Sequence, residues 1–290
     1  MSVPGVLVTG AGSGIGLAIA RLLAASGFRV FAGVHRASGK LGDGICEVVL
    51  DVTSADSIAA ARREIEGGLG SEGLFAIVNN AGVGDVMPLE FTPLERFRQT
   101  FDVNVLGVVA VTQAFLPLVH KGRGRIVNIG SVGGMITIPF GAALTASKHA
   151  IESISDALRL ELYAAGIHVT CIQPASINSG SAEKLAAKTE ETIAALPPEA
   201  RRRYGAALRG FVKTMLKSET KGSPPEAVAQ TVLAVLRAKK PPARKLVGKD
   251  GLLLKILARD VPEAARDALL RKLFLGNPAF GSQPEGSSAD

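Results

Sequence analysis

Tryptophan is absent from the 290-residue sequence, and tyrosine and cysteine occur only twice each. The cysteines, Cys46 and Cys171, border or begin apolar runs, so we expect two buried free thiols and no disulfide. Free thiols are typical of a reducing compartment. A charged and cleavable segment ahead of the apolar run at 6–9 is also absent. Together these absences favour a cytoplasmic protein.

Long apolar runs and clusters of metal ligands are equally scarce. The least charged stretch, 103–119, is too short and too polar for a transmembrane segment, so we expect a buried helix there. No group of His, Cys or carboxylate residues has the spacing of metal ligands, so no metal is expected. Basic residues gather at 201–203 and 237–245, but no nucleic-acid motif accompanies them, and we expect no nucleic-acid partner. A solvated basic face is the simpler interpretation of the net charge of +7, and attraction of an anionic cofactor or lipid is the alternative.

Short apolar runs that alternate with longer amphipathic segments are, by contrast, abundant. The apolar runs are 6–9, 29–34, 46–50, 74–80, 124–130 and 167–174. Helical patterns lie between them at 14–26, 54–67, 93–120 and 144–165. Near-continuous apolar strands separated by helices predict an α/β fold, a doubly wound parallel sheet of the Rossmann type.

The domain organisation follows from the length and from the lack of any linker or internal repeat. We expect a single domain over 1–275, with a substrate loop at 175–222 and a C-terminal helical extension at 249–275. Within that extension, 252–274 has the pattern of one amphipathic helix. The composition of 276–290 predicts a disordered tail.

Four glycines lie between the first predicted strand and the first predicted helix: Gly10, Gly12, Gly14 and Gly16. Glycine lets the backbone turn sharply and approach a pyrophosphate closely. The helix that follows offers free N–H groups and the positive end of its dipole. Because the glycines stand directly after a strand and directly before a helix, they predict a dinucleotide site.

The spacing T-G-x-x-x-G-I-G over 9–16, with NNAG at 79–82, resembles the short-chain dehydrogenase/reductase family. The resemblance extends from Val6 to about Ser179. The sequence SVGGMITIPFGAALTASK and the long C-terminal extension look like the hydroxysteroid and retinol dehydrogenase branch. The resemblance implies hydride transfer between a nicotinamide cofactor and an alcohol or carbonyl compound.

The resemblance also implies which residues bind the cofactor. They are Thr9, Gly10, Gly12, Ser13, Gly14, Ile15, Gly16, His35, Arg36, Asp51, Val52, Asn79, Ala81, Gly82, Lys148, Pro174, Ala175, Ile177 and Ser179. In the family an aspartate at the end of the second strand marks NAD, and Val34 stands there in this chain. NADP is favoured over NAD, since no carboxylate repels a 2′-phosphate and Arg36 can pair with one. The alternative is that Arg36 is a solvated loop residue.

The same resemblance assigns more specific roles to two of these segments. Asp51 is expected to accept from the adenine amino group, and Val52 to donate its backbone N–H. The segment 174–179, PASINS, matches the family pattern P-G-x-x-x-T, with Ala175 and Ser179 as mild departures. The backbone of Ile177 is then expected to meet the nicotinamide carboxamide.

The catalytic group of the family has four members, and three are present. Asn104 is expected to support a water chain, Ser131 to polarise the substrate carbonyl, and Lys148 to hold the nicotinamide ribose and lower the pKa of the acid. The fourth is a tyrosine placed four residues before the lysine and thirteen after the serine, and that position is Leu144. Residues i and i+4 share one helix face, so the family's lysine can stabilise a phenolate there. Leucine has no proton to give.

Three interpretations of Leu144 are open. The chain is a reductase whose activity is impaired by an introduced or natural leucine. Alternatively, it is an enzyme with another proton donor, such as Ser131 through water, Lys148 or Tyr204, or with another reaction of the bound nucleotide. Finally, it is a cofactor-binding pseudoenzyme with a scaffolding or sensing role. Survival of the other three catalytic residues favours the first two interpretations.

The predicted substrate is a small hydrophobic alcohol or carbonyl compound, because the substrate loop is largely apolar. Its larger side chains are Leu185, Ile193, Leu196, Tyr204, Leu208, Phe211 and Met215. In the family, the helices at 93–120 and 144–165 commonly form subunit interfaces, so we expect a homodimer or homotetramer. The segment 252–274 is expected to pack on its own domain, with a partner subunit or weak contact with a lipid surface as alternatives.

Overall fold

The protein, represented by a computed structural model that describes residues 3–275, is built on a sheet of seven strands in the order β3-β2-β1-β4-β5-β6-β7. All six neighbouring pairs are parallel. The strands are β1 (Gly5–Thr9), β2 (Arg29–Val34), β3 (Ile45–Val49), β4 (Leu74–Asn79), β5 (Arg125–Ile129), β6 (His168–Pro174) and β7 (Arg244–Val247). The predicted doubly wound fold is therefore confirmed.

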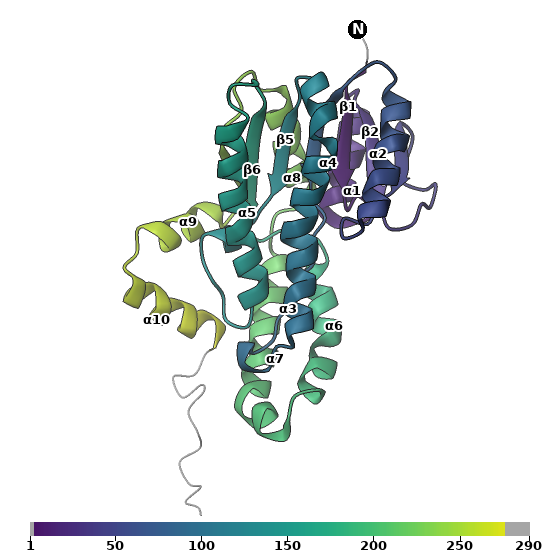
Figure 1. Ribbon diagram of the computed structural model, residues 1–290. Helices are drawn as coiled ribbons and strands as arrows, with labels where there is room; N and C mark the ends of the chain where they lie inside the picture. The colour runs from purple at the N-terminus through teal and green to yellow at the C-terminus, as the bar shows by residue number, and fades with distance from the viewer. Residues whose placement is uncertain (1–2, 276–290) are drawn as a thin grey trace, which may run out of the picture.

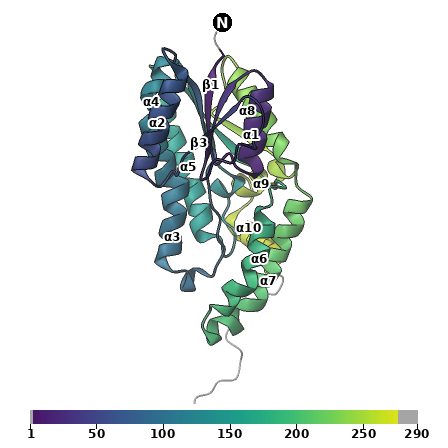
Figure 2. The ribbon, with the colours of Figure 1, turned by 90° about the vertical axis from the view of Figure 1, so that its right-hand side faces the viewer.

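Helices cover both faces of this sheet. The helices of the described chain are α1 (Gly14–Ala25), α2 (Ala55–Leu69), α3 (Leu94–Phe101), α4 (Gly107–Lys121), α5 (Ala142–Glu161), α6 (Ser181–Ala194), α7 (Pro198–Thr220), α8 (Pro225–Arg237), α9 (Gly251–Arg259) and α10 (Glu263–Phe274), with short turns η1 (Leu89–Phe91), η2 (Asp102–Leu106) and η3 (Val132–Gly134); not all of them lie on the sheet. Figure 2 shows α1 and α8 on one face, and α2 and α4 on the other.

The alternation of side chains along each strand fills two core layers. Val6 and Val8 of β1 point into the layer under α1 and α8, whereas Leu7 points into the layer under α2 and α4. Both faces are buried, which explains why the strands are apolar almost throughout.

One prediction about the cysteines is wrong. Both thiols are free, and Cys171 on β6 is buried as expected, but Cys46 is exposed. The reason is the position of β3 at the edge of the sheet, where Val48 is the only residue of the strand that is buried.

The apolar stretch predicted as a buried helix lies within a continuous helical run, Leu94–Lys121. A π-helical turn at Asp102–Leu106 joins α3 to α4. Within the described part of the chain, this is the one helix long and apolar enough to cross a membrane by length and composition, and half of its most apolar window is buried inside the protein. Its own residues Val111 and Phe115 point into the core, as a core helix requires.

The C-terminal half departs from the prediction at one point. The segment 252–274 forms two helices, α9 and α10, because Pro262 disfavours helical backbone at the residue before it. The substrate loop consists of α6 and α7, which extend beyond the carboxyl ends of the strands (Figure 1). The predicted tail at 276–290 lies outside the described residues.

Candidate active site at the carboxyl edge of the sheet

The loops that follow β1, β4, β5 and β6 meet at the carboxyl edge of the sheet. An ideal Cβ on Gly10 would lie 2.8 Å from the Cα of Ala81, so the loop after β1 touches the loop after β4. An ideal Cβ on Gly14 would lie 3.3 Å from the carbonyl oxygen of Ser179, so the loop after β6 covers the same turn. The predicted cofactor segments thus come together where the strand order reverses, between β1 and β4.

Three of the four turn glycines are required by the chain itself. Gly10 and Gly14 have φ of +64° and +54°, which disfavour any other residue. A Cβ on Gly16 would lie 2.2 Å from the carbonyl oxygen of Gly10. Gly12 differs, because it is exposed and its Cβ would meet only Val34 Cγ1, at an ordinary 3.7 Å. The lack of a side chain at Gly12 therefore leaves an open cradle, as the close approach of a pyrophosphate requires.

The helix that begins beside Gly12 has a free N-terminus. Its N-cap Ser13 has extended backbone and makes no capping hydrogen bond to the described residues, and no acidic residue lies in the first turn. The N–H groups of the first turn, which includes Ile15, are therefore available to an anion, and the helix dipole favours one there. These features fit the predicted nicotinamide dinucleotide.

The side chain of Thr9 holds the turn and the NNAG segment together. Its buried hydroxyl accepts hydrogen bonds from the backbone N–H groups of Asn80 and Ala81, both at 3.0 Å. The Asn80 amide in return donates to the carbonyl oxygens of Thr9 (2.9 Å) and Gly10 (3.2 Å). Thr9 and Asn80 thus join the loop after β1 to the loop after β4. Asn80 was not among the predicted site residues.

Asn79 was predicted to line the cofactor ribose, but its side chain points into the core. Its amide donates to Thr112 Oγ1 at 3.1 Å and to Asn128 Oδ1 at 2.9 Å. If Asn79 contacts the ribose, it therefore does so through its backbone atoms and not through its side chain. Ala81 lies beside the glycine turn, whereas Gly82 lies beside Asn104, whose Oδ1 would be 3.3 Å from an ideal Cβ on Gly82.

The end of β2 presents no carboxylate to the crevice. Val34 is buried and faces Gly12, as the 3.7 Å distance indicates. His35 and Arg36 follow as exposed residues. Arg36 forms no ion pair with the described residues, so its guanidinium can reach a ligand.

Asp51, which is predicted to accept from the adenine amino group, is held in place by Thr53. Its Oδ1 accepts from the backbone N–H (2.9 Å) and the hydroxyl (2.7 Å) of Thr53. These hydrogen bonds, backbone first, with a smaller contribution from His35, hold the pKa of the carboxyl below its ordinary value against the opposing effect of burial. Val52 is buried against Gly107, at the start of α4, and this contact fixes the strand end.

Asn104 lies on the π-helical turn and joins two elements of the site. Its Oδ1 accepts from the N–H of Val83 at 2.8 Å, and its amide donates to the Val83 carbonyl at 2.9 Å and to Ser147 Oγ at 3.0 Å. Ser147 in turn donates to the carbonyl oxygen of Leu144 at 2.7 Å. The predicted asparagine thus ties the loop after β4 to the first turns of α5, and π-helical turns often mark functional sites.

Ser131 and Lys148 are brought together where β5 ends. Lys148 Nζ donates to the carbonyl oxygen of Ile129 at 3.0 Å, two residues before Ser131. Burial lowers the pKa of this ammonium, and the thiol of Cys171 opposes the shift. The Ser131 hydroxyl accepts from Gly133 N–H at 3.0 Å, and its nearest acceptor is the Pro174 carbonyl at a long 3.5 Å. Its proton is therefore free to turn toward a substrate oxygen.

Leu144 lies one helical turn before Lys148 on the same face of α5. Its side chain is partly exposed and lies beside Gly84, whose ideal Cβ would be 3.6 Å from Leu144 Cδ2. The missing side chain of Gly84 leaves space there.

Tyr204 is not placed as a substitute acid. Its hydroxyl donates to Glu90 Oε2 at 2.7 Å, and this bond raises the pKa of the phenol. Its ring packs against Phe91 and Phe140. The hydrogen bond to Glu90 and the ring contact with Phe91 attach α7 to η1.

The segment after β6, 174–179, which is predicted to bind the nicotinamide, is held by residues outside the predicted site. Ile177 is buried and pairs with Ser223. The carboxylate of Glu219, on the last turn of α7, accepts from the N–H and hydroxyl of Ser179, both within 3.0 Å, and from the N–H groups of Ser181 and Ala182. Glu219 therefore caps the first turn of α6 from 37 and 38 residues away, a contact that no local sequence pattern predicts.

The segment's first residues also have backbone anchors. Ala175 N–H donates to Val247 O on β7 at 2.8 Å, and Pro174 ends β6 with its ring buried. Beyond the segment, five of the predicted residues of the substrate loop gather with Val86 and Phe140, namely Leu185, Ile193, Leu208, Phe211 and Met215. Ile193 and Leu208 are fully buried within this cluster, so they form the core of the lid that α6 and α7 make. Leu196 and Tyr204 lie instead in a separate cluster with Met87.

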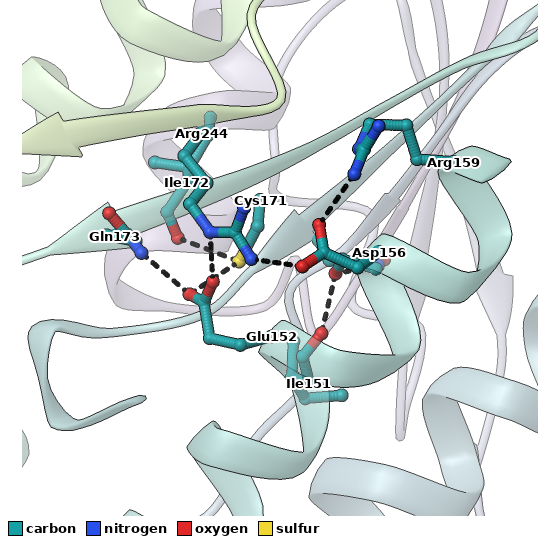
Figure 3. A network of polar contacts seen from close by, with 10 residues as sticks. Ile151, Glu152, Asp156, Arg159, Cys171, Ile172, Gln173 and Arg244 are labelled. Carbon is teal, nitrogen blue, oxygen red and sulfur yellow. Dashed lines mark hydrogen bonds and ion pairs between the residues drawn. The ribbon is translucent and has the colours of Figure 1, made fainter. Parts of the chain in front are cut away.

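A buried network supports α5 beneath the catalytic residues (Figure 3). Glu152, one turn after Lys148, accepts from Cys171 Sγ (3.1 Å), Gln173 Nε2 (2.9 Å) and Arg244 Nε (2.8 Å). Arg244 also donates to Asp156 at 2.6 Å. Burial and the Glu152 carboxylate together raise the pKa of the Cys171 thiol. The network joins α5 to β6 and β7 and so fixes the helix that carries Lys148.

Two substitutions distinguish Gly16, which the backbone of the turn requires, from Gly12, which we expect only the bound cofactor to require. We expect Gly12→Ala to leave the melting temperature unchanged, because its Cβ meets no close neighbour, but to weaken cofactor binding at least about tenfold. We expect Gly16→Ala to lower the free energy of unfolding by about 1–3 kcal/mol, because its Cβ overlaps the Gly10 carbonyl. Thermal melting and fluorescence titration measure the two effects, and unchanged affinity in Gly12→Ala would contradict a pyrophosphate at this turn.

Comparison with known proteins agrees with the geometry. The family model of the short chain dehydrogenases matches residues 5–190. A 17-beta-hydroxysteroid dehydrogenase type 6 from Rattus norvegicus is 36% identical over 276 residues, covering 91% of this chain and 87% of the relative. An NADPH-dependent 3-dehydrocapnine reductase from Ornithobacterium rhinotracheale is 33% identical over 282 residues, covering 92% and 95%. A solved short-chain dehydrogenase from Streptomyces avermitilis superimposes with a TM-score of 0.73 at 25% identity, covering 93% and 96%.

These matches confirm the family and the hydroxysteroid dehydrogenase-like branch that the motifs predicted. The chain belongs to the short-chain dehydrogenase/reductase family, whose members are oxidoreductases of alcohols and carbonyl compounds that use a nicotinamide cofactor.

Proposed function

We propose that this protein is an NADP(H)-dependent oxidoreductase of a small hydrophobic alcohol or carbonyl compound, with a low rate because Leu144 replaces the catalytic tyrosine. The observation that carries the proposal is that the other three residues of the family's catalytic group are present around this position. Asn104, Ser131 and Lys148 keep the places and hydrogen bonds described above, although one acid is missing.

The residues that remain of the catalytic group have the following roles in the proposed reaction. The nicotinamide, when bound, supplies or accepts the hydride. Ser131 donates a hydrogen bond to the substrate oxygen, because its hydroxyl has only a distant acceptor, the Pro174 carbonyl, among the described residues. Lys148 holds the nicotinamide ribose by the family role, and its proton, or that of Ser131 through water, replaces the phenol's. Loss of a positioned acid costs about 10²–10⁴ in rate, whereas orientation of the reactants is retained.

The preference for NADP(H) is supported by the end of β2. Val34 brings no charge to repel a 2′-phosphate, and the exposed Arg36 has no ion-pair partner among the described residues. The NADPH dependence of the reductase that is 33% identical points the same way. The pseudoenzyme interpretation predicts binding of either cofactor without turnover of any carbonyl compound.

Fluorescence titration with NADPH and NADH tests this preference. We expect NADPH to bind more tightly, and Arg36→Ala to weaken NADPH binding about tenfold while NADH is unaffected, because a charge-assisted hydrogen bond contributes about 1.5–3 kcal/mol. Arg63→Ala on the exposed side of α2 is the matched control. Val34→Asp should reverse the preference. Equal affinities in the parent protein would contradict NADP as the cofactor.

We further propose a cytoplasmic homo-oligomer formed through α4 and α5. The support is a set of exposed apolar side chains near these helices: Leu106, Leu160 and Tyr163. A monomeric mass by light scattering would contradict this assembly.

A further inference from the structure

The last two helices, α9 and α10, present an apolar outer face. We call them the C-terminal helix pair, Gly251–Phe274. Figure 1 shows the pair projecting from the side of the molecule, where α9 contacts β7 and η3 and α10 contacts α7. Five large apolar side chains of the pair are at least 44% exposed: Leu252, Leu253, Ile256, Leu269 and Leu273. Single exposed leucines are ordinary, but a group of five on consecutive helices indicates an interaction surface.

The pair is nevertheless firmly attached by its inner face. Leu257 and Leu270 are buried against Ile136, in the loop that follows Ser131. The ring of Phe274 lies 5.4 Å from that of Phe211 on α7. Each helix therefore has a buried side that packs on the body, as expected, and an opposite side that no described residue covers.

Basic residues accompany the apolar ones. On α9, Lys255 and Arg259 lie at helical spacing from Leu252 and Ile256, on the exposed side of the helix. On α10, Arg271 and Lys272 flank the exposed leucines. None of these four cations forms an ion pair among the described residues.

The fifth basic residue of the pair behaves differently and is accounted for within the fold. Arg266 is partly buried and pairs with Glu263 at 3.7 Å and with Asp267 at 3.9 Å. The acidic residues of α10 are thus engaged by Arg266, and the cations of the outer face stay free.

We propose that the C-terminal helix pair docks on the surface of an anionic lipid bilayer. Exposed leucines beside unpaired lysine and arginine are the combination that inserts shallowly among lipid headgroups and attracts anionic ones. A second copy of the chain is a poorer occupant, because a symmetric contact would bring like charges together. The docking is independent of the proposed function. Only its consequence, that a hydrophobic substrate is met dissolved in the bilayer, rests on that function.

Vesicle sedimentation with the full chain tests the docking. Vesicles of phosphatidylcholine alone are compared with vesicles of equal parts phosphatidylcholine and phosphatidylglycerol. We expect binding to the anionic vesicles only, weakened by salt. The double variant Leu252→Asn/Leu253→Asn should lower the partition coefficient at least about tenfold. The double variant Lys255→Glu/Arg259→Glu should lower it by at least about tenfold as well, since each basic residue near the surface contributes about fivefold.

Matched controls change the same residue types at exposed positions elsewhere. Leu89→Asn removes an exposed leucine from η1, outside the proposed subunit interface, and Lys239→Glu/Lys240→Glu makes the same change of net charge after α8. Both should bind anionic vesicles like the parent. Circular dichroism melting checks that all variants fold, which the exposed positions lead us to expect.

Three results would overturn the proposal. The first is a parent protein that leaves both kinds of vesicle unbound. The second is an equal loss of binding in the control variants, which would make the attraction a property of net charge. The third is a change of oligomeric mass in Leu252→Asn/Leu253→Asn with vesicle binding unaltered, which would assign this face to a second copy of the chain.

Discussion

Leu144→Tyr is expected to raise the rate of carbonyl reduction at least about tenfold, and up to the 10²–10⁴ that a positioned general acid contributes. The new phenol would stand one helical turn before the Lys148 ammonium, which stabilises the phenolate and lowers the pKa of the tyrosine. Steady-state kinetics with NADPH and a panel of hydrophobic ketones measure the change. The gain should be in kcat, because the acid acts in the transition state.

The surroundings of position 144 can accept the larger ring. Gly84 lies directly beside Leu144, and its missing side chain leaves room next to the helix. The backbone of the turn is held independently of the side chain, since Ser147 donates to the Leu144 carbonyl and is itself bonded to Asn104. The substitution should therefore add a hydroxyl without moving Lys148.

Leu144→Phe is the matched control, because it adds the ring without the hydroxyl. Its rate should stay at the level of the parent protein, with cofactor affinity equal in all three proteins. A gain in Leu144→Phe equal to that in Leu144→Tyr would mean that packing limits the rate. Equal rates in Leu144→Tyr and the parent, with cofactor bound in both, would exclude the impaired-reductase interpretation and leave a different donor, a different reaction or a binding role.

The parts of this molecule that sequence predicts are those whose cause is local. The strands are readable because both faces of each central strand are buried, and the glycine turn is readable because Gly10 and Gly14 need positive φ. The spacing between Leu144 and Lys148 likewise follows from one helical turn. Even the break between α9 and α10 had a local signal in Pro262, which the amphipathic pattern of 252–274 concealed.

What sequence could not supply is the pairing of side chains across the fold. Asn79 stands beside Asn80 in one motif, yet only the fold sends the first to Thr112 and Asn128 in the core. Glu219 caps α6 at Ser181 and Ala182 because α7 returns antiparallel to α6, and no sequence pattern near residue 219 predicts this contact. Such contacts depend on tertiary placement, and the hydrophobic pattern carries no information about them.

The network under α5 is one of these contacts that the sequence does not predict. Breaking it is expected to change the free energy of unfolding more than any other substitution proposed for this protein. Arg244 on β7 pairs with Glu152 (2.8 Å) and Asp156 (2.6 Å) of α5, and the Glu152 side chain is only 12% exposed. Arg244→Leu would leave the Glu152 carboxylate buried without its cation. Removal of one partner from a buried pair costs about 3–5 kcal/mol, and because Arg244 is itself 32% exposed we expect about 3 kcal/mol.

Urea denaturation of the parent, Arg244→Leu and a control measures this loss. The control is Arg209→Leu, which breaks an exposed bidentate pair with Glu190 (2.6 Å) and should cost at most about 1 kcal/mol. The gap between Arg244→Leu and the parent should narrow as the pH falls below about 4. Arg244 lowers the pKa of Asp156, so that contribution exists above the unfolded pKa and disappears as the carboxyl is protonated. Equal losses in Arg244→Leu and Arg209→Leu would mean that water already screens the Glu152 carboxylate, and that packing of α5 on β6, without this ion pair, positions Lys148.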